Sequence, residues 1–120
     1  MKRVANHSAR PCVQNREAFQ ANNIFAEWRD DDTFDARYIV YSYGKHFPMY
    51  IWVPDSQGPA AGRWYGNSDK FSRSTSKHQS QAHPPVAGSE IEWRDTDAMV
   101  AIANQGIAGW VAYELREEAA

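Results

Sequence analysis

Apolar and polar positions alternate most clearly in the central third of the chain. Residues 36–43 (ARYIVYSY) are β-branched and aromatic on both faces, which is typical of a central strand. After a short turn, residues 47–53 (FPMYIWV) predict the second strand of an antiparallel hairpin. The Pro- and Gly-rich residues 54–62 predict a loop, and residues 63–66 and 70–72 predict two further short strands.

Weaker patterns precede this central region. Residues 23–29 (NIFAEWR) alternate as one short strand. Residues 12–19 have no clean apolar face, and the polar residues 1–11 predict a flexible arm. The chain therefore predicts a small antiparallel sheet of three to five strands.

Two helices are expected after the sheet. Residues 74–82 predict a short polar helix, because Ser and Thr favour its start and two prolines follow it; its composition is equally compatible with disorder. Residues 97–104 predict an amphipathic helix that ends near Gly106. Residues 109–115 fit both a helix and a strand. The predicted fold class is α+β.

Length and composition predict that these strands and helices form one domain. A chain of 120 residues fits one core, which the 16 Phe, Trp and Tyr residues help to fill. Cys12 is the only cysteine, so an internal disulfide is excluded and a reducing cytosol is indicated. We expect its small side chain to be buried. No apolar run approaches the length of a membrane span, so we expect a soluble, cytoplasmic protein without a membrane partner.

Charge is unevenly distributed along the chain. The net charge is −2, but residues 37–83 carry six basic and two acidic residues, whereas residues 84–120 carry two basic and seven acidic residues. Such a dipolar surface bears on the choice of partner rather than on the fold.

Motifs for metal or catalytic chemistry are weak. His46, His78 and His83 lack the paired spacing of a zinc site, and the acidic residues 30–35 lack the turn glycine of a calcium loop. No glycine-flanked nucleophile turn accompanies the serines. We therefore expect no metal, no cofactor and no catalytic residue, and binding is favoured over enzymatic activity.

A set of short motifs resembles a known family. These motifs are Tyr41-Ser42-Tyr43-Gly44-x-His46-Phe47-Pro48, Trp64-Tyr65-x-Asn67, Lys70-Phe71-Ser72 and Thr75-Ser76-Lys77-His78, with weaker support from residues 19–23. Together they resemble a family of small proteins carried by bacteriophages, plasmids and other mobile elements. The resemblance covers residues 36–84 and implies a biological setting, the host bacterial cytoplasm, rather than a mechanism. By analogy, small phage proteins often inhibit a host machine, as anti-CRISPR proteins do.

Two functions follow as hypotheses. The first is a non-enzymatic accessory protein that binds and inhibits a host nucleic-acid-targeting defence complex, so that its partner is a host protein or ribonucleoprotein. The second is a small nucleic-acid-binding domain that uses the basic segment 63–83, which is rich in Ser, Thr, Lys and His. The candidate basic binding face comprises Arg63, Lys70, Arg73, Thr75, Lys77 and His78, and an alternative acidic patch comprises Asp30, Asp31, Asp32 and Asp35. Nothing in the sequence specifies an oligomeric state.

Overall fold

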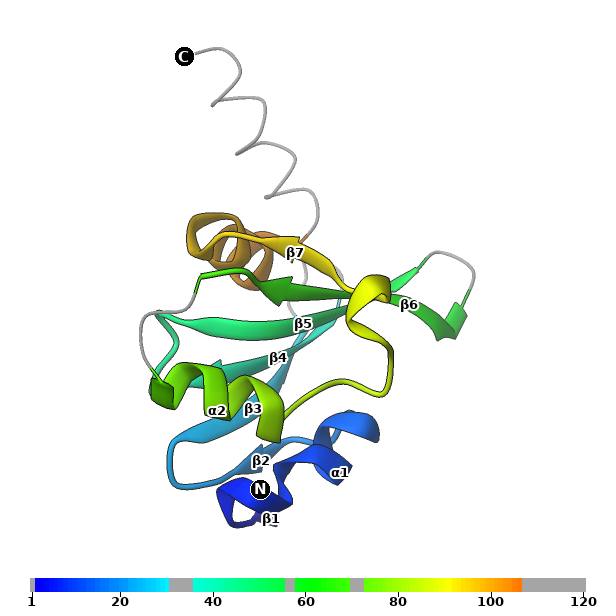
Figure 1. The fold of residues 1–120 in the computed structure, drawn as a ribbon. Helices are drawn as coiled ribbons and strands as arrows, with labels where there is room; N and C mark the ends of the chain where they lie inside the picture. The colour runs from blue at the N-terminus through cyan, green and yellow to red at the C-terminus, as the bar shows by residue number, and fades with distance from the viewer. Residues whose placement is uncertain (1, 31–35, 56–57, 70–72, 107–120) are drawn as a thin grey trace.

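In the part of the chain that the structure describes, seven strands lie in sequence order in one mixed sheet (Figure 1). The computed structural model describes residues 2–30, 36–55, 58–69 and 73–106. The four interior pairs are antiparallel, whereas β1 pairs with β2 and β6 pairs with β7 in parallel. The strands are β1 (Lys2–Arg3), β2 (Phe19–Gln20), β3 (Ile24–Arg29), β4 (Arg37–Ser42), β5 (Pro48–Asp55), β6 (Gly58–Asn67) and β7 (Glu92–Arg94).

The prediction of three to five antiparallel strands is wrong, although the fold class is still α+β. Strands β1, β2 and β7 have only two or three residues each, too few to show an alternating pattern. The two outer pairs are parallel, and a parallel pair needs a crossover connection, which is usually helical. The helices α1 (Ala9–Gln14) and α2 (Arg73–Gln81) lie in these two crossovers.

Two apolar clusters, one on each face of the sheet, form the core. Every residue of β4 is buried, so that Tyr38 and Val40 enter one cluster while Ile39 and Tyr41 enter the other. This confirms the prediction of a central strand with two apolar faces. The first cluster is completed by Ala9, Cys12 and Val13 of α1 and by Ala82, and the second by Met99, Ile102 and Ala103.

The N-terminal segment and the helices can also be compared with their predictions. The segment predicted as a flexible arm contains β1, the 3₁₀ helix η1 (Asn6–Ser8) and the start of α1. Cys12 is 2% exposed, which confirms the expected burial of its thiol. The predicted polar helix corresponds to α2, and the predicted amphipathic helix corresponds to helical residues 96–106. A second 3₁₀ helix, η2 (Gly88–Glu90), precedes β7.

The loop predicted over residues 54–62 is wrong, because strands β5 and β6 continue through most of it. Pro54 pairs with Gly62, and the register shifts between Pro54 and Asp55. A proline is tolerated at such an irregularity because no regular ladder hydrogen bond is needed there. The strand predicted over residues 70–72 and the helix-or-strand question at residues 109–115 lie outside the described residues.

Candidate functional site

The residues of the predicted basic face do not share one environment. Lys77 is exposed on α2, whereas His78 beside it is buried, with 4% of its surface exposed. Arg63 is exposed on β6, which lies near the opposite edge of the sheet from β1. Arg73 and Thr75 belong to α2, but their side chains, like all of Lys70, lie outside the described part of the structure. The predicted face is therefore divided, and Lys77 is the exposed α2 cation that the structure describes.

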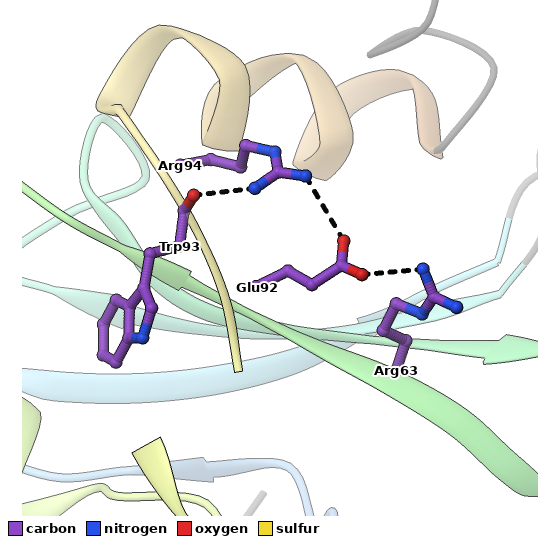
Figure 2. A network of polar contacts seen from close by, with 4 residues as sticks. All are labelled: Arg63, Glu92, Trp93 and Arg94. Atoms are coloured by element: carbon purple, nitrogen blue, oxygen red, sulfur yellow. Dashed lines mark hydrogen bonds and ion pairs between the residues drawn. The ribbon is translucent and has the colours of Figure 1, made fainter. Parts of the chain in front are cut away.

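Arg63 belongs to a separate polar network on β6 and β7 (Figure 2). Its Nη1 atom lies 2.7 Å from Oε1 of Glu92, and Nη2 of Arg94 lies 3.3 Å from Oε2 of the same carboxylate. Arg94 also donates from Nη1 to the carbonyl oxygen of Trp93 at 2.8 Å. The charge of Arg63 is thus partly neutralised by Glu92, so Arg63 is a weaker candidate for binding an anion than Lys77.

His78 holds α2 against the sheet. Its Nδ1 atom shares a hydrogen bond with Oγ of Ser42 at 2.7 Å, and Ser42 itself is 1% exposed. Burial lowers the pKa of the His78 imidazole below its ordinary value, and the nearby Lys77 charge lowers it further. The neutral ring is accordingly a structural hydrogen-bonding partner. A serine nucleophile would have to reach its substrate, and Ser42 does not have this access.

A second set of hydrogen bonds joins the end of β6 to both neighbouring helices. The fully buried Asn67 donates from Nδ2 to the backbone carbonyl oxygen of Pro48 at 3.0 Å. The backbone carbonyl oxygen of Asn67 accepts a hydrogen bond from Nε2 of Gln79 at 2.8 Å. Asp69 accepts from both the hydroxyl and the backbone N–H of Thr96, at 2.7 and 2.8 Å. The hydroxyl bond, followed by the backbone bond, lowers the pKa of the Asp69 carboxyl. These hydrogen bonds account for the fold rather than for recognition of a partner.

Tyr43 is the exposed aromatic residue beside this buried framework. It is 57% exposed and has a φ of 64°, which is the left-handed region that non-glycine residues rarely adopt. Its N–H donates to the carbonyl oxygen of Asn23 at 2.8 Å, and its ring centroid lies 5.0 Å from that of His78. The contacts therefore hold the ring in place while leaving more than half of the residue accessible.

A cationic face lies next to Tyr43 and was missed by the sequence analysis. Residues 2–16 contain four Lys or Arg residues and residues 73–84 contain two, and neither segment contains Asp or Glu. The two segments pack together, since Arg10 donates to the carbonyl oxygen of Ser80, and α2 contacts η1 (Figure 1). We define the cationic face by its exposed Arg and Lys members, which are Arg3, Arg10 and Lys77. The absence of acidic residues was visible in both segments, but only the fold brings them together.

A pocket opens beside the cationic face. It has a volume of about 340 Å³ and lies between β1, η1 and the turn that connects β2 to β3. Its lining residues are Arg3, Val4, Ala5, Asn6, Ala21 and Asn22. Asn23, which accepts the hydrogen bond from Tyr43, follows directly after this lining. The pocket, Tyr43 and the cationic face therefore lie in one region of the molecule.

The alternative acidic patch is only partly described. Asp30 is exposed at the end of β3, and Asp31, Asp32 and Asp35 lie outside the described residues. Within the described ranges, His, Cys, Asp and Glu side chains do not gather in groups of three or more that could hold a metal ion. None of the helices in the described part of the chain is long and apolar enough to cross a membrane.

No protein-family model, curated protein or solved structure matches this chain. The exposed side chains themselves are therefore the basis for a functional assignment.

Proposed function

We propose that the chain is a non-enzymatic nucleic-acid-binding domain that contacts a single strand with the cationic face and stacks a base on Tyr43. The observation that carries this proposal is the packing of two segments without carboxylates, residues 2–16 and 73–84, against each other. A surface with several cations and no nearby anion from the same segments is suited to a polyanion, because each cation can neutralise a phosphate.

Tyr43 favours a single strand over a duplex. Its ring is exposed, and aromatic side chains stack on unpaired bases regardless of sequence. Bases within a duplex are already stacked on one another, so this contribution of about 1–3 kcal/mol per base is lost there. Lys77 lies one residue from His78, whose ring contacts Tyr43, so a phosphate contact and a base contact can be made by the same strand.

Fluorescence anisotropy with labelled single- and double-stranded DNA and RNA tests the proposal. We expect binding to weaken steeply as salt rises from about 50 to 200 mM, because cations are released from the phosphates. Lys77→Ala should lower the slope of log K against log salt by about one, and Tyr43→Asn should weaken single-strand binding about tenfold or more. Asn is chosen because it tolerates a positive φ.

Arg63→Ala is the matched control for Lys77→Ala. Both variants lose one positive charge from an exposed side chain, but Arg63 is paired with Glu92 and lies outside the cationic face. Equal effects of the two substitutions would show that net charge alone governs binding. Absence of binding by the unmodified protein at low salt would overturn the proposal.

A second candidate function is a mobile-element accessory protein that binds and inhibits a host nucleic-acid-targeting complex. It is favoured by the motif resemblance and by hydrogen bonds between motif residues: Ser42 bonds to His78, and Asn67 donates to Pro48. Co-purification with host proteins after nuclease treatment tests it, with Asp30→Asn and Lys77→Ala as variants. A complex that survives nuclease and is weakened by either substitution supports inhibition by direct protein contact; recovery of no host complex argues against it.

A further inference from the structure

The pocket beside η1 combines one cation, two amides and small apolar side chains. Arg3, Asn6 and Asn22 supply the polar lining, whereas Val4 and the alanines supply the apolar lining. Its volume of about 340 Å³ is at the lower end of the range of small-molecule sites, which are about 300–1,000 Å³. A planar ligand with one charged group would match both parts of this lining.

The polar groups of the pocket retain unused hydrogen-bonding capacity. Asn6 uses Oδ1 to accept from the backbone N–H of Asn23 at 3.1 Å, and its amide nitrogen has no partner in the described part of the chain. Within the same residues, the side chains of Arg3 and Asn22 have neither a hydrogen bond nor an ion pair. Lys2 differs, because it pairs with Glu17 at 3.6 Å. Arg3, Asn6 and Asn22 therefore have donors available for a ligand of this pocket.

We infer that this pocket binds one nucleotide of the strand, with Arg3 on its phosphate and the amides of Asn6 and Asn22 on the edge of its base. Asparagine amides offer both donors and acceptors, which suits hydrogen bonding to a base edge, and the guanidinium fork suits a phosphate. Ala5 and Ala21 are small apolar residues of the lining, against which a flat ring would pack. This inference rests on the proposed function and assigns to it a site that reads base identity.

The position of Tyr43 supports this assignment. Its backbone N–H donates to Asn23, and Asn23 in turn donates to Asn6 of the pocket. One backbone–backbone hydrogen bond and one bond from a backbone N–H to a side-chain oxygen thus link the residue that carries the exposed ring to the pocket. One nucleotide can stack on Tyr43 while a neighbouring nucleotide enters the pocket, which is how single-stranded RNA readers combine stacking with edge recognition.

Two measurements test the inference. In the first, ¹⁵N–¹H spectra follow the Asn6 and Asn22 side-chain amides during separate titrations with four nucleoside monophosphates, the matching nucleosides and inorganic phosphate. We expect saturable shifts with the monophosphates, strongest for one base, and weaker shifts with nucleoside or phosphate alone. Shifts of equal size with inorganic phosphate would reduce the pocket to an anion site and overturn the inference.

In the second measurement, Arg3→Ala and Asn22→Ala are compared in single-strand binding with Lys2→Ala and Asn15→Ala. Arg3 and Lys2 each carry one positive charge, Asn22 and Asn15 each carry one side-chain amide, and Lys2 and Asn15 do not line the pocket. We expect the two pocket variants to weaken binding about fivefold to tenfold and to flatten the preference among homopolymers. The controls should stay within about twofold of the unmodified protein. Equal effects of pocket and control variants overturn the inference alone, whereas absence of any oligonucleotide binding overturns the proposed function with it.

Discussion

Lys77 and His78 are adjacent in sequence, and the structure predicts opposite consequences for their replacement. Lys77 is exposed and has no described hydrogen bond, so Lys77→Ala should change the free energy of unfolding by no more than about 0.5 kcal/mol. His78 is 4% exposed and bonds to the 1% exposed Ser42. His78→Ala removes a bond worth about 1 kcal/mol and leaves a buried hydroxyl unsatisfied at a further cost of about 1–3 kcal/mol.

Thermal and urea unfolding, followed by circular dichroism, measure this difference. A loss of about 2–4 kcal/mol in a domain of 120 residues corresponds to a fall in Tm of about 10 °C. Ser42→Ala combined with His78→Ala should cost less than the sum of the single substitutions, because the double variant leaves no unsatisfied partner. The effects on single-strand binding should have the opposite order to the effects on stability. Lys77→Ala should weaken binding more than His78→Ala does in its folded state.

The stability contributed by His78 should also depend on pH. Burial holds its pKa in the folded state below the ordinary value of 6.5, so the unfolded chain takes up a proton before the folded chain does. The contribution of His78 to the free energy of unfolding is therefore fully present above pH 6.5. It decreases as the pH falls from 6.5 toward the pKa of His78 in the folded state. His78→Ala should remove this part of the pH dependence. Equal stabilities of Lys77→Ala and His78→Ala, or an unchanged pH profile in the latter, would refute the assigned structural role.

Two further predictions concern the framework around the site. Gly62→Ala should destabilise the protein by about 1–3 kcal/mol, because a Cβ atom at position 62 would lie 2.3 Å from the buried Trp52 ring. A Cβ atom at position 88 would meet nothing within 4 Å, so Gly88→Ala should leave the Tm unchanged or slightly raised. Equal Tm values for the two variants would contradict this packing. Thr96→Val should raise the pKa of Asp69 toward its ordinary value, because the hydrogen bond from the Thr96 hydroxyl is the main cause of the lowered pKa. An NMR titration of the Asp69 carboxyl that shows no change in this variant would exclude that cause.

The sequence predicted the centre of the fold better than its edges. Strands β4 and β5 have continuous apolar and β-branched residues that identify them at once. The residues that flank helix α2 predict it although the helix lacks an apolar stripe. The structure explains the missing stripe, because His78 and Gln79 pack through hydrogen bonds. Strands β1 and β7 could not be found, because a two- or three-residue strand is specified by its crossover partner and not by its own pattern.

The candidate site could be predicted only in part, for a similar reason. Lys77 and Arg63 lie in the same basic block of the sequence. In the structure, however, Arg63 is paired with Glu92, and the segment that contains Lys77 packs against the segment that contains Arg10. The contact between Arg10 and the backbone of Ser80 spans 70 positions of sequence. No local pattern encodes such a separation, so the cationic face follows from topology.

The backbone conformation of Tyr43 supports the binding role that we propose for this residue. A left-handed conformation costs a non-glycine residue about 1–2 kcal/mol, and an exposed ring recovers little of this by burial. Tyr43→Asn should therefore be at least as stable as the unmodified protein, because asparagine adopts this conformation more readily. Strain of this kind is retained where function requires it. If Tyr43→Asn instead destabilised the protein by more than about 1 kcal/mol, the ring would be part of the packing against His78. The same variant should lose single-strand binding, so that stability and function change in opposite directions.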